Sequence, residues 1–355
     1  MSTKTKVKSP LSQFLFNTRR GNILFSILFF ILLCIFLEVA TRAFLNFYIT
    51  GARMGQLAKL SYQPYVVWVN GRKTDQYQQL VNREVPAKGE DTYRIIVIGG
   101  STSEQVPSEE LIRGFSPYVD KRVEVWNLGH GGYLINQSLI MLALYGIQLE
   151  PDLIINIDGV NDISDFTKMM PPGVVYHSKY VTRAVESPWV NALFSVVNNS
   201  QFVLAVIKLG ERAQERAAQH DVERFEKMAD NFVTTVGTIS ALAEGKGIKH
   251  LAVLQPYLFL RSSITPREQS LVKWYEYRRE FYKKSFLSMK EELSRQNFTQ
   301  STMLITALDA FDQSNEEVFI DEVHLTPEGN RLFVDYIVKK AVMAGVLPAE
   351  KMKKR

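Results

Sequence analysis

The chain has 355 residues, of which 46% are hydrophobic and 22% are charged, so it can bury a large core and is not disordered as a whole. Its net charge is +5, but five of its 42 lysines and arginines lie among the first 20 residues, which contain no acid. The rest of the chain has 37 basic and 37 acidic residues, and this neutral balance argues against a basic surface for nucleic acid.

An uncharged stretch of 17 residues, 21–37, follows the basic N-terminal tail of residues 1–20. As a helix it would be about 25 Å long, and extension to residue 45 brings it close to the roughly 30 Å hydrocarbon layer of a membrane. The alternatives are a cleaved signal peptide, which needs a small-x-small site where residues 38–42 stand, and a buried core helix, which needs no flanking cations. We therefore predict an uncleaved transmembrane anchor at residues 21–45. Its basic flank would stay in the cytoplasm and the remainder would be periplasmic or extracellular, as in a bacterial inner-membrane protein.

Disulfides and metal sites are not expected. The only cysteine, Cys34, lies inside the apolar stretch, so neither an intrachain disulfide nor a thiolate zinc site can form. His177, His220 and His250 do not have the spacing of metal ligands, and we expect no metal and no other cofactor.

A polar segment with scattered aromatic residues at 46–90 leads into a region where predicted strands and helices alternate. The predicted strands are at 94–98, 123–128, 153–157, 250–254 and 303–306. The predicted helices are at 136–148, 221–244, 271–293 and from Pro327, with Thr326 as N-cap, to Gly345. This alternation predicts an α/β fold with a parallel sheet covered on both faces. Residues 163–216 do not fit it and are predicted to form an inserted lid or substrate-contacting segment.

Four groups of polar residues and glycines fall in the loops of this region. They are at 99–103, 127–132, 158–162 and 321–327. The first three directly follow predicted strands, and ligands of parallel sheets bind where the carboxyl ends of the strands meet.

Each group also has an ordinary structural interpretation. Ser101, at a strand-to-helix turn, presents a hydroxyl and nearby backbone N–H groups, but such a serine also caps helices or binds phosphate. It is not a Gly-x-Ser-x-Gly elbow, because Ser103 replaces the final glycine. Asn161 can donate to an oxyanion or close an Asx-turn. His130 is an alternative base, but it has no acid at a suitable spacing and is better explained as a structural histidine.

Taken together, a serine, a glycine, an asparagine and Asp-x-x-His in this order resemble the four sequence blocks of the SGNH (GDSL-like) hydrolase family, from about residue 94 to 337. The resemblance implies a flavodoxin-like three-layer α/β/α sandwich with a five-stranded parallel sheet, spanning 91–345 and followed by a basic tail at 346–355. It also implies a catalytic triad of Ser101, Asp321 and His324. The backbone N–H groups of Ser101 and Gly132 and the side chain of Asn161 would then form the oxyanion hole.

One position departs from the family pattern, because Gly100 stands where the first block usually has aspartate. Gly-Gly-Ser-Thr variants look like a branch of the family, so the departure puts the substrate class in doubt and leaves the nucleophile in place. We expect a membrane-anchored serine esterase that acts on acyl esters of envelope or exported glycans or lipids through an acyl-enzyme. The alternatives are an O-acyltransferase with the same triad and a non-catalytic scaffold of an envelope assembly.

Overall fold

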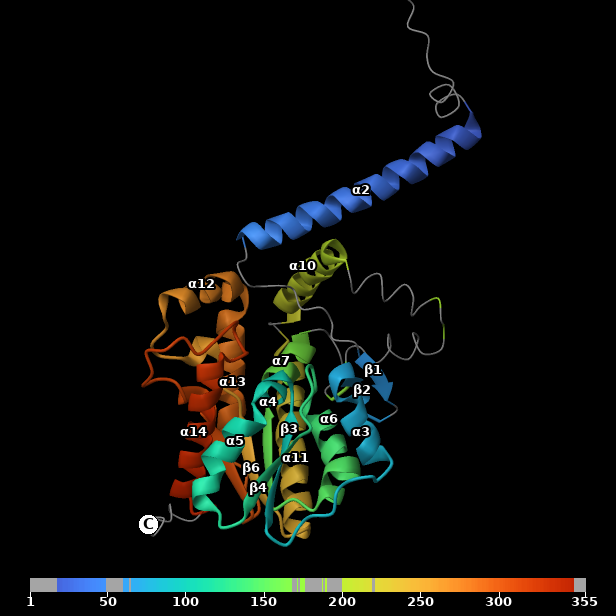
Figure 1. Ribbon diagram of the computed structural model, residues 1–355. Coiled ribbons are helices and arrows are strands. Elements are labelled where there is room, and N and C mark those ends of the chain that lie inside the picture. The colour runs from blue at the N-terminus through green and yellow to red at the C-terminus, as the bar shows by residue number, and fades with distance from the viewer. Residues whose placement is uncertain are drawn as a thin grey trace, which may run out of the picture. The chain divides into compact units, whose positions relative to one another are not determined.

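The computed structural model describes residues 18–48, 60–63, 65–167, 171, 173–175, 187, 189, 200–218 and 221–347. The chain divides into two compact units, one of residues 1–58 and 186–210 and the other of residues 59–185 and 211–355. The first unit contains the long helix α2 (Arg19–Tyr48) and the beginning of α10 (Gln201–Ala218). Within α2 (Figure 1), residues Arg19–Ala43 are apolar enough and long enough to cross a membrane, and almost all of their side chains are exposed.

The second unit is built on a parallel five-stranded sheet, as predicted. Its strands are β3 (Thr92–Gly99), β4 (Arg122–Asn127), β5 (Leu153–Asp158), β6 (Lys249–Leu254) and β7 (Thr302–Thr306). They lie in the order β4-β3-β5-β6-β7, which is the strand order of flavodoxin-like sheets. The run of residues 95–98 in β3 is completely buried, because helices cover both faces of a sheet of this kind.

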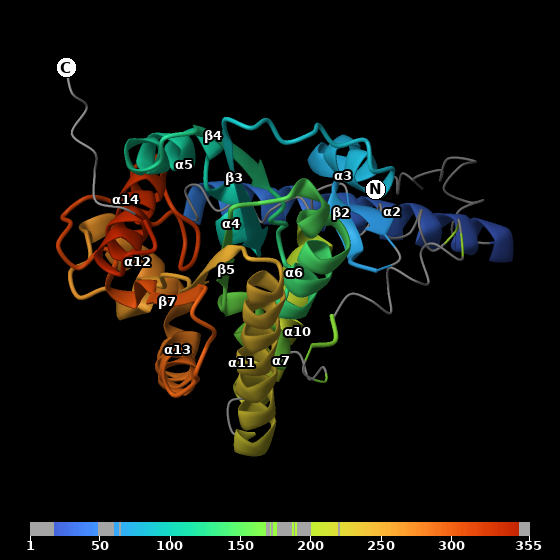
Figure 2. The same cartoon turned by 90° about the horizontal axis from the view of Figure 1, so that it is seen from below.

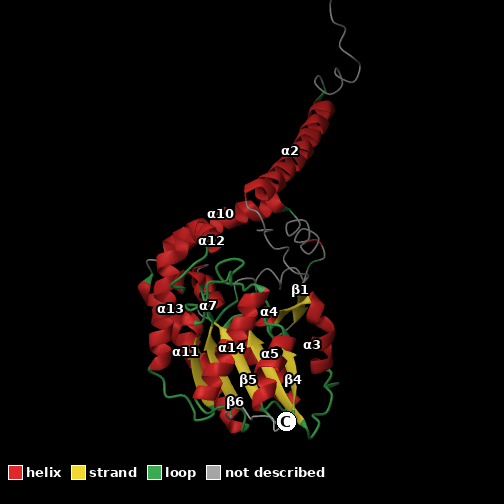
Figure 3. Cartoon of the chain, turned by 60° about the vertical axis from the view of Figure 1, so that its left-hand side comes forward, coloured by secondary structure: helices red, strands yellow, loops and turns green. Residues whose placement is uncertain are grey.

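Helices form the two outer layers. On one face, α5 (Ser108–Phe115) packs against α14 (Pro327–Met343), and on the other α11 (Val222–Gly245) packs between α6 (Ile135–Met141) and α13 (Arg279–Ser294) (Figures 2 and 3). The Thr326 hydroxyl accepts a hydrogen bond from the Gly329 N–H at 3.0 Å, and Pro327 occupies the first turn of α14 as predicted. The three-layer α/β/α architecture is therefore confirmed.

Two predicted helices differ in detail from the observed ones. The helix predicted at 271–293 is wrong as one element, because α12 (Pro266–Tyr275) and α13 are separated by a 3-10 turn at Glu276–Arg278. A capping box between Thr265 and Glu268 starts α12 earlier than the apolar pattern indicates. The helix predicted at 136–148 continues from α6 into a π turn (Leu142–Gly146) and a 3-10 turn (Ile147–Leu149).

The segment before the sheet has structure that the sequence pattern did not predict. An antiparallel hairpin of β1 (Leu60–Gln63) and β2 (Val67–Asn70) is followed by a 3-10 turn (Gly71–Lys73) and α3 (Thr74–Val81). Buried Trp68, Tyr77 and Leu80 join it to the core of the second unit, and the hydroxyls of Tyr77 and Tyr145 lie 2.9 Å apart. The lid predicted at 163–216 lies partly outside the described residues, which include the end of α7 (Val160–Thr167), residues 171, 173–175, 187, 189 and 200, and α10.

Candidate active site

Three side chains that are distant in sequence form a hydrogen-bonded row at the carboxyl edge of the sheet. Ser101 begins the short helix α4 (Ser101–Gln105) directly after β3, and its Oγ lies 2.8 Å from Nε2 of His324. Nδ1 of His324 lies 2.6 Å from Oδ2 of Asp321. A hydroxyl, an imidazole and a carboxylate in this order can move a proton from the hydroxyl to a base that the carboxylate orients.

The electrostatics of the row favour a strong base. Burial alone would lower the pKa of His324, but the hydrogen bond and charge of Asp321, with the charges of Glu322 and Glu104, raise it above its ordinary value. Burial would raise the pKa of Asp321, but the hydrogen bond and charge of His324 lower it overall. The carboxylate therefore stays ionised and favours the protonated imidazole, which is what a general base needs once it has accepted a proton.

Asp321 is fixed by its own loop as well as by the imidazole. Its Oδ1 accepts hydrogen bonds from the backbone N–H groups of Val323 at 2.8 Å and His324 at 2.7 Å. The loop closes on itself, because the Ile320 N–H donates to the His324 carbonyl at 2.9 Å. The three-residue spacing of Asp and His thus produces a compact turn in which one carboxylate orients both the backbone and the ring.

A buried ion pair binds the backbone of the segment that leads to the Asp321 loop. Arg261 and Glu268 are both buried, and their side chains form a 2.5 Å contact. The other Glu268 oxygen accepts from the N–H groups of Val318 at 3.0 Å and Phe319 at 3.1 Å. Arg261 also donates to the carbonyl of Ser314 at 2.6 Å. The segment that leads to Asp321 is therefore attached to α12 through a desolvated charge pair.

The glycine-containing loop after β4 lies beside Ser101. The Gly131 N–H donates to Oε2 of Glu104 at 2.7 Å, and a Cβ at Gly131 would lie 3.9 Å from Cβ of Ser101. Gly132 has a φ of +79°, which side chains other than hydrogen rarely tolerate. This left-handed backbone conformation, which would be strained for any other residue, explains why this position of the loop is a glycine.

Asn161, in the first turn of α7 directly after β5, lies next to the turn that carries Ser101. Its Nδ2 donates to the Tyr133 carbonyl at 2.9 Å, and a Cβ at Gly100 would overlap that nitrogen. The amide therefore lies against the backbone that immediately precedes Ser101. The structure thus brings the loops that carry Ser101, Gly132, Asn161, Asp321 and His324 to one edge of the sheet.

The N-terminal segment contributes contacts that the sequence analysis missed. The Lys73 ammonium donates to the carbonyls of Asn127 at 2.9 Å and Gly129 at 2.7 Å. The Trp68 indole N–H donates to the Gly131 carbonyl at 3.3 Å, and the Tyr133 hydroxyl donates to the Trp68 carbonyl at 2.5 Å. Trp68 and Lys73 therefore fix the backbone of the glycine-containing loop through hydrogen bonds to its carbonyl groups. No motif signals this role, because the contacts link positions more than 50 residues apart.

A buried carboxyl group contacts the backbone next to Ser101. Asp158, at the end of β5, accepts from the Ser138 hydroxyl at 2.9 Å and the Asn156 amide at 2.5 Å. Burial raises the pKa of Asp158 to about 7, although these hydrogen bonds and one from the Gly100 N–H oppose the rise. Asp158 thus connects the backbone of the Ser101 turn to α6.

The remaining histidines have other surroundings. His130 is buried next to the Tyr133 ring, and burial together with the charge of Lys73 lowers its pKa to about 3. His250, inside β6, is buried and lies 3.1 Å from the Thr302 hydroxyl. His177 and His220 fall outside the described residues. Within the described part of the chain, no three His, Cys, Asp or Glu side chains come together as a metal site requires.

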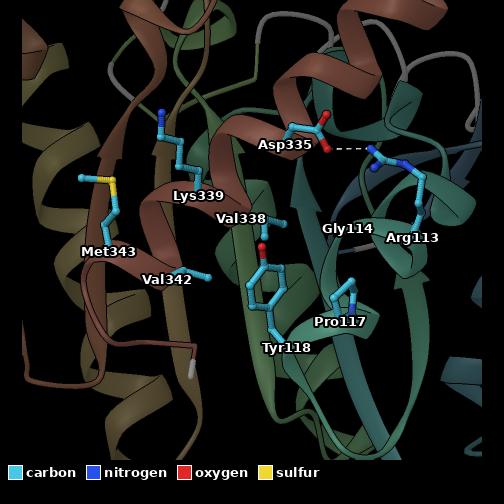
Figure 4. A pocket seen from close by; sticks show the side chains of 9 residues that line it. All are labelled: Arg113, Gly114, Pro117, Tyr118, Asp335, Val338, Lys339, Val342 and Met343. Carbon is cyan, nitrogen blue, oxygen red and sulfur yellow. Dashed lines mark hydrogen bonds and ion pairs between the residues drawn. The ribbon is translucent and has the colours of Figure 1, made fainter. Parts of the chain in front are cut away.

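A surface hollow of about 350 Å³ lies away from these groups, between α5 and α14 (Figure 4). The ion pair of Arg113 and Asp335, at 2.7 Å, lies at its edge, and Val338, Val342 and Met343 form part of its apolar wall. None of the residues that line it belongs to the row of Ser101, His324 and Asp321, so we assign it no part in the chemistry.

Comparisons with known proteins give hydrolases of low sequence identity. No protein-family model matches the chain, and no curated protein sequence is similar to it. A structure described as an acylhydrolase from Bacteroides fragilis is 15% identical with a TM-score of 0.42, and the match covers 78% of this chain and 98% of that one. A variant of an acetyl-xylooligosaccharide esterase from Geobacillus is 10% identical with a TM-score of 0.40, covering 70% of this chain and 93% of that one. A lipase from a goat rumen metagenome is 15% identical with a TM-score of 0.43, covering 71% and 97%.

Proposed function

We propose that the chain is a membrane-anchored serine ester hydrolase of the SGNH type, with its catalytic unit outside the cytoplasm. The observation that carries the proposal is the pair of hydrogen bonds from Ser101 to His324, at 2.8 Å, and from His324 to Asp321, at 2.6 Å. The proposed substrates are acyl esters of envelope or exported glycans or of lipids, because the catalytic unit would face them.

The proposed reaction begins with attack of the Ser101 Oγ on the ester carbonyl while His324 Nε2 takes its proton. The developing oxyanion accepts hydrogen bonds from the backbone N–H groups of Ser101 and Gly132 and from the Asn161 amide, one of whose hydrogens is held by Tyr133. The alcohol leaves with the proton from His324. Water then attacks the carbonyl carbon of the acyl-enzyme while His324 takes a proton from the water. The bond from that carbon to the Ser101 Oγ breaks, His324 returns the proton to the Oγ, and the acid is released.

The test uses the full chain in detergent micelles and short p-nitrophenyl acyl esters. Ser101→Ala should abolish hydrolysis and labelling by a fluorophosphonate probe, because both require that hydroxyl. Ser270→Ala, which changes an exposed hydroxyl of α12, is the matched control and should change neither. Hydrolysis that persists in Ser101→Ala would remove this residue from its role, and failure of the wild type to label would favour a non-catalytic scaffold.

Hydrolysis and transfer are separated by measuring both products. Water and a sugar hydroxyl would compete for the same acyl-enzyme, so free acid and acylated acceptor are quantified together in the presence of a polysaccharide acceptor. Release of acid without acylated acceptor supports the hydrolase. Formation of acylated acceptor without free acid would show that the protein is an O-acyltransferase and not a hydrolase.

A further inference from the structure

An acidic side chain near the C-terminal end of the apolar part of α2 has four hydrogen-bond partners. Oε1 of Glu38 accepts from Nε of Arg42 at 2.7 Å and from the Gln201 N–H at 3.0 Å. Oε2 accepts from the Ser200 hydroxyl at 2.9 Å and from the Phe202 N–H at 3.0 Å. An ionisable residue at the end of a membrane-spanning helix is costly unless it is paired. Glu38 is paired by the first turn of α10.

This contact fixes the level at which α10 begins. The first N–H groups of a helix have no partner within the helix, and a carboxylate that accepts from them is favoured by the helix dipole. Glu38 directly follows the uncharged stretch 21–37 and lies near the C-terminal end of the apolar segment Arg19–Ala43, so its partner helix starts near the edge of the hydrocarbon layer that this segment would span. Residues 200–202 therefore belong to the border between lipid and water.

The first half of α10 presents an apolar stripe. Phe202, Val206, Leu209 and Ala213 follow the spacing i, i+4, i+7 and i+11, which places them along one side of a helix. Val206 is 52% exposed and Leu209 is 63% exposed. These side chains lie in the same compact unit as α2 up to residue 210.

The sequence around this stripe has the composition of a membrane interface. No charged residue or histidine occurs between Glu186 and Lys208, and Trp189, in the same stretch, is 86% exposed. Tryptophan is enriched at the headgroup level of membranes. Among the described residues only α2 is apolar and long enough to cross, so α10 has the character of a helix that lies in the interface.

We infer that the first half of α10, residues 201–209, lies in the interfacial layer of the phospholipid bilayer that α2 spans, held there by Glu38. The inference rests on the proposed membrane anchor and is independent of the esterase chemistry. The apolar stripe would contact lipid at the boundary between headgroups and acyl chains, because the Glu38 carboxylate, which binds the first turn of α10, lies at that depth.

The experiment places an environment-sensitive fluorophore on the full chain in vesicles of phosphatidylethanolamine and phosphatidylglycerol. In a Cys34→Ser background, Val206→Cys and Leu209→Cys each carry the probe. The control is Met343→Cys, a 74% exposed apolar position on α14. Lipids with a doxyl group near the headgroup, or near the end of the acyl chain, quench a probe at the matching depth.

We expect the probes at 206 and 209 to emit at shorter wavelength and to be quenched most by the shallow doxyl group, whereas the probe at 343 shows neither effect. Glu38→Ala should remove most of the quenching at 209, while Glu223→Ala, which alters an exposed acid of α11, should leave it unchanged. Quenching at 206 and 209 no greater than at 343 overturns the inference. A blue shift without quenching also overturns it, because a protein surface then covers the stripe.

Flotation of the same vesicles separates the two proposals. If the chain does not float with the lipid, both the anchor and the interfacial helix are wrong. If the chain floats and the probes at 206 and 209 are not quenched, the anchor stands and only the interfacial helix is wrong.

Discussion

Gly100 is restricted by space and not by backbone conformation. Its φ of −80° and ψ of −155° are accessible to any residue, but a Cβ would overlap Nδ2 of Asn161 and come within 3.3 Å of the Tyr133 carbonyl oxygen. Any larger side chain at position 100 would displace the Asn161 amide from this position. The position of Asn161 therefore requires a glycine before Ser101.

The first prediction concerns this close approach. Gly100→Ala should lower kcat by about ten- to a hundredfold, because a displaced Asn161 gives up part of an oxyanion contact worth roughly 10²- to 10³-fold. Fluorophosphonate labelling of Ser101 should persist. Gly237→Ala is the control, since a Cβ there meets nothing within 4 Å. An unchanged kcat in Gly100→Ala would show that Asn161 takes no part in the reaction.

The second prediction concerns the pH dependence of kcat/KM. In the proposed mechanism neutral His324 is the active form, and its raised pKa should place the acidic limb of the profile above the ordinary histidine value of 6.5. Glu104→Gln keeps an oxygen that can accept from the Gly131 N–H but removes a charge that stabilises the imidazolium. The limb should therefore move to lower pH. Glu109→Gln, at an exposed position of α5, should not move it. A shift to higher pH would contradict the electrostatic account of His324.

The five proposed site residues could be named from the sequence because the motifs that contain them, taken together, resemble the four SGNH blocks. Glu104 and Lys73 do not follow from it. Their partners are in the glycine-containing loop, 27 residues from Glu104 and up to 56 from Lys73, and neither side chain belongs to a motif. Such supporting contacts depend on how the loops pack, which local patterns do not contain.

At the scale of elements, β2 and the 3-10 turn at Gly71–Lys73 act as a brace for the loop after β4, through Trp68 and Lys73. The third prediction tests Lys73, whose ammonium joins two carbonyls of that loop. Lys73→Met should lower kcat about ten- to a hundredfold with little change in KM, because small misplacements of catalytic groups have effects of this size. Leaving the carbonyls unpaired should also cost about 1–3 kcal/mol of unfolding free energy.

Lys88 provides a matched control for Lys73 in the same N-terminal segment. Its ammonium contacts the Glu150 carbonyl at 2.9 Å and Asp152 at 2.7 Å, just before β5 begins and so at the opposite edge of the sheet. Lys88→Met should reduce stability without lowering kcat. If both variants lose activity in proportion to stability, Lys73 has only a structural role.

The fourth prediction concerns the ion pair beneath the Asp321 loop. Glu268→Ala leaves the buried Arg261 unpaired and should lower the free energy of unfolding by about 3–5 kcal/mol. Glu317→Ala removes an exposed partner of Arg267, 3.3 Å away in the same region, and should change it by less than about 1 kcal/mol. Urea unfolding in detergent micelles measures both. Equal effects would mean that burial does not distinguish the two pairs.

The sequence predicts elements well where a strand or helix contains a continuous run or regular spacing of buried apolar residues. The five strands of the parallel sheet and α14 are predicted correctly, because buried β-branched runs and a threonine-proline start are strong local signals. The hairpin was not predicted, since its strands have four residues each and its buried Trp68 and Tyr77 show no clear periodicity. The break between α12 and α13 was missed because apolar spacing continues across the 3-10 turn.

At the scale of the whole molecule, the unequal charge of the chain predicts its orientation in the membrane. The five cations of residues 1–20 should remain in the cytoplasm and the neutral remainder should cross. In the fifth prediction, again in a Cys34→Ser background, an impermeant maleimide applied to spheroplasts should label Met343→Cys but not Ser2→Cys. Permeabilisation should make position 2 reactive, and labelling of position 2 in intact spheroplasts would reverse the topology.

The order of the chain also has a consequence for when the proposed enzyme becomes competent. The hydroxyl of Ser101 and the imidazole that would activate it are separated by 223 residues. If translocation proceeds from the anchor toward the C-terminus, Ser101 crosses the membrane before His324. Until His324 follows, the Ser101 hydroxyl has no base to activate it. A nascent or prematurely terminated chain would carry the serine without its base, so the proposed ester cleavage would begin only after residues 321–324 have crossed the membrane.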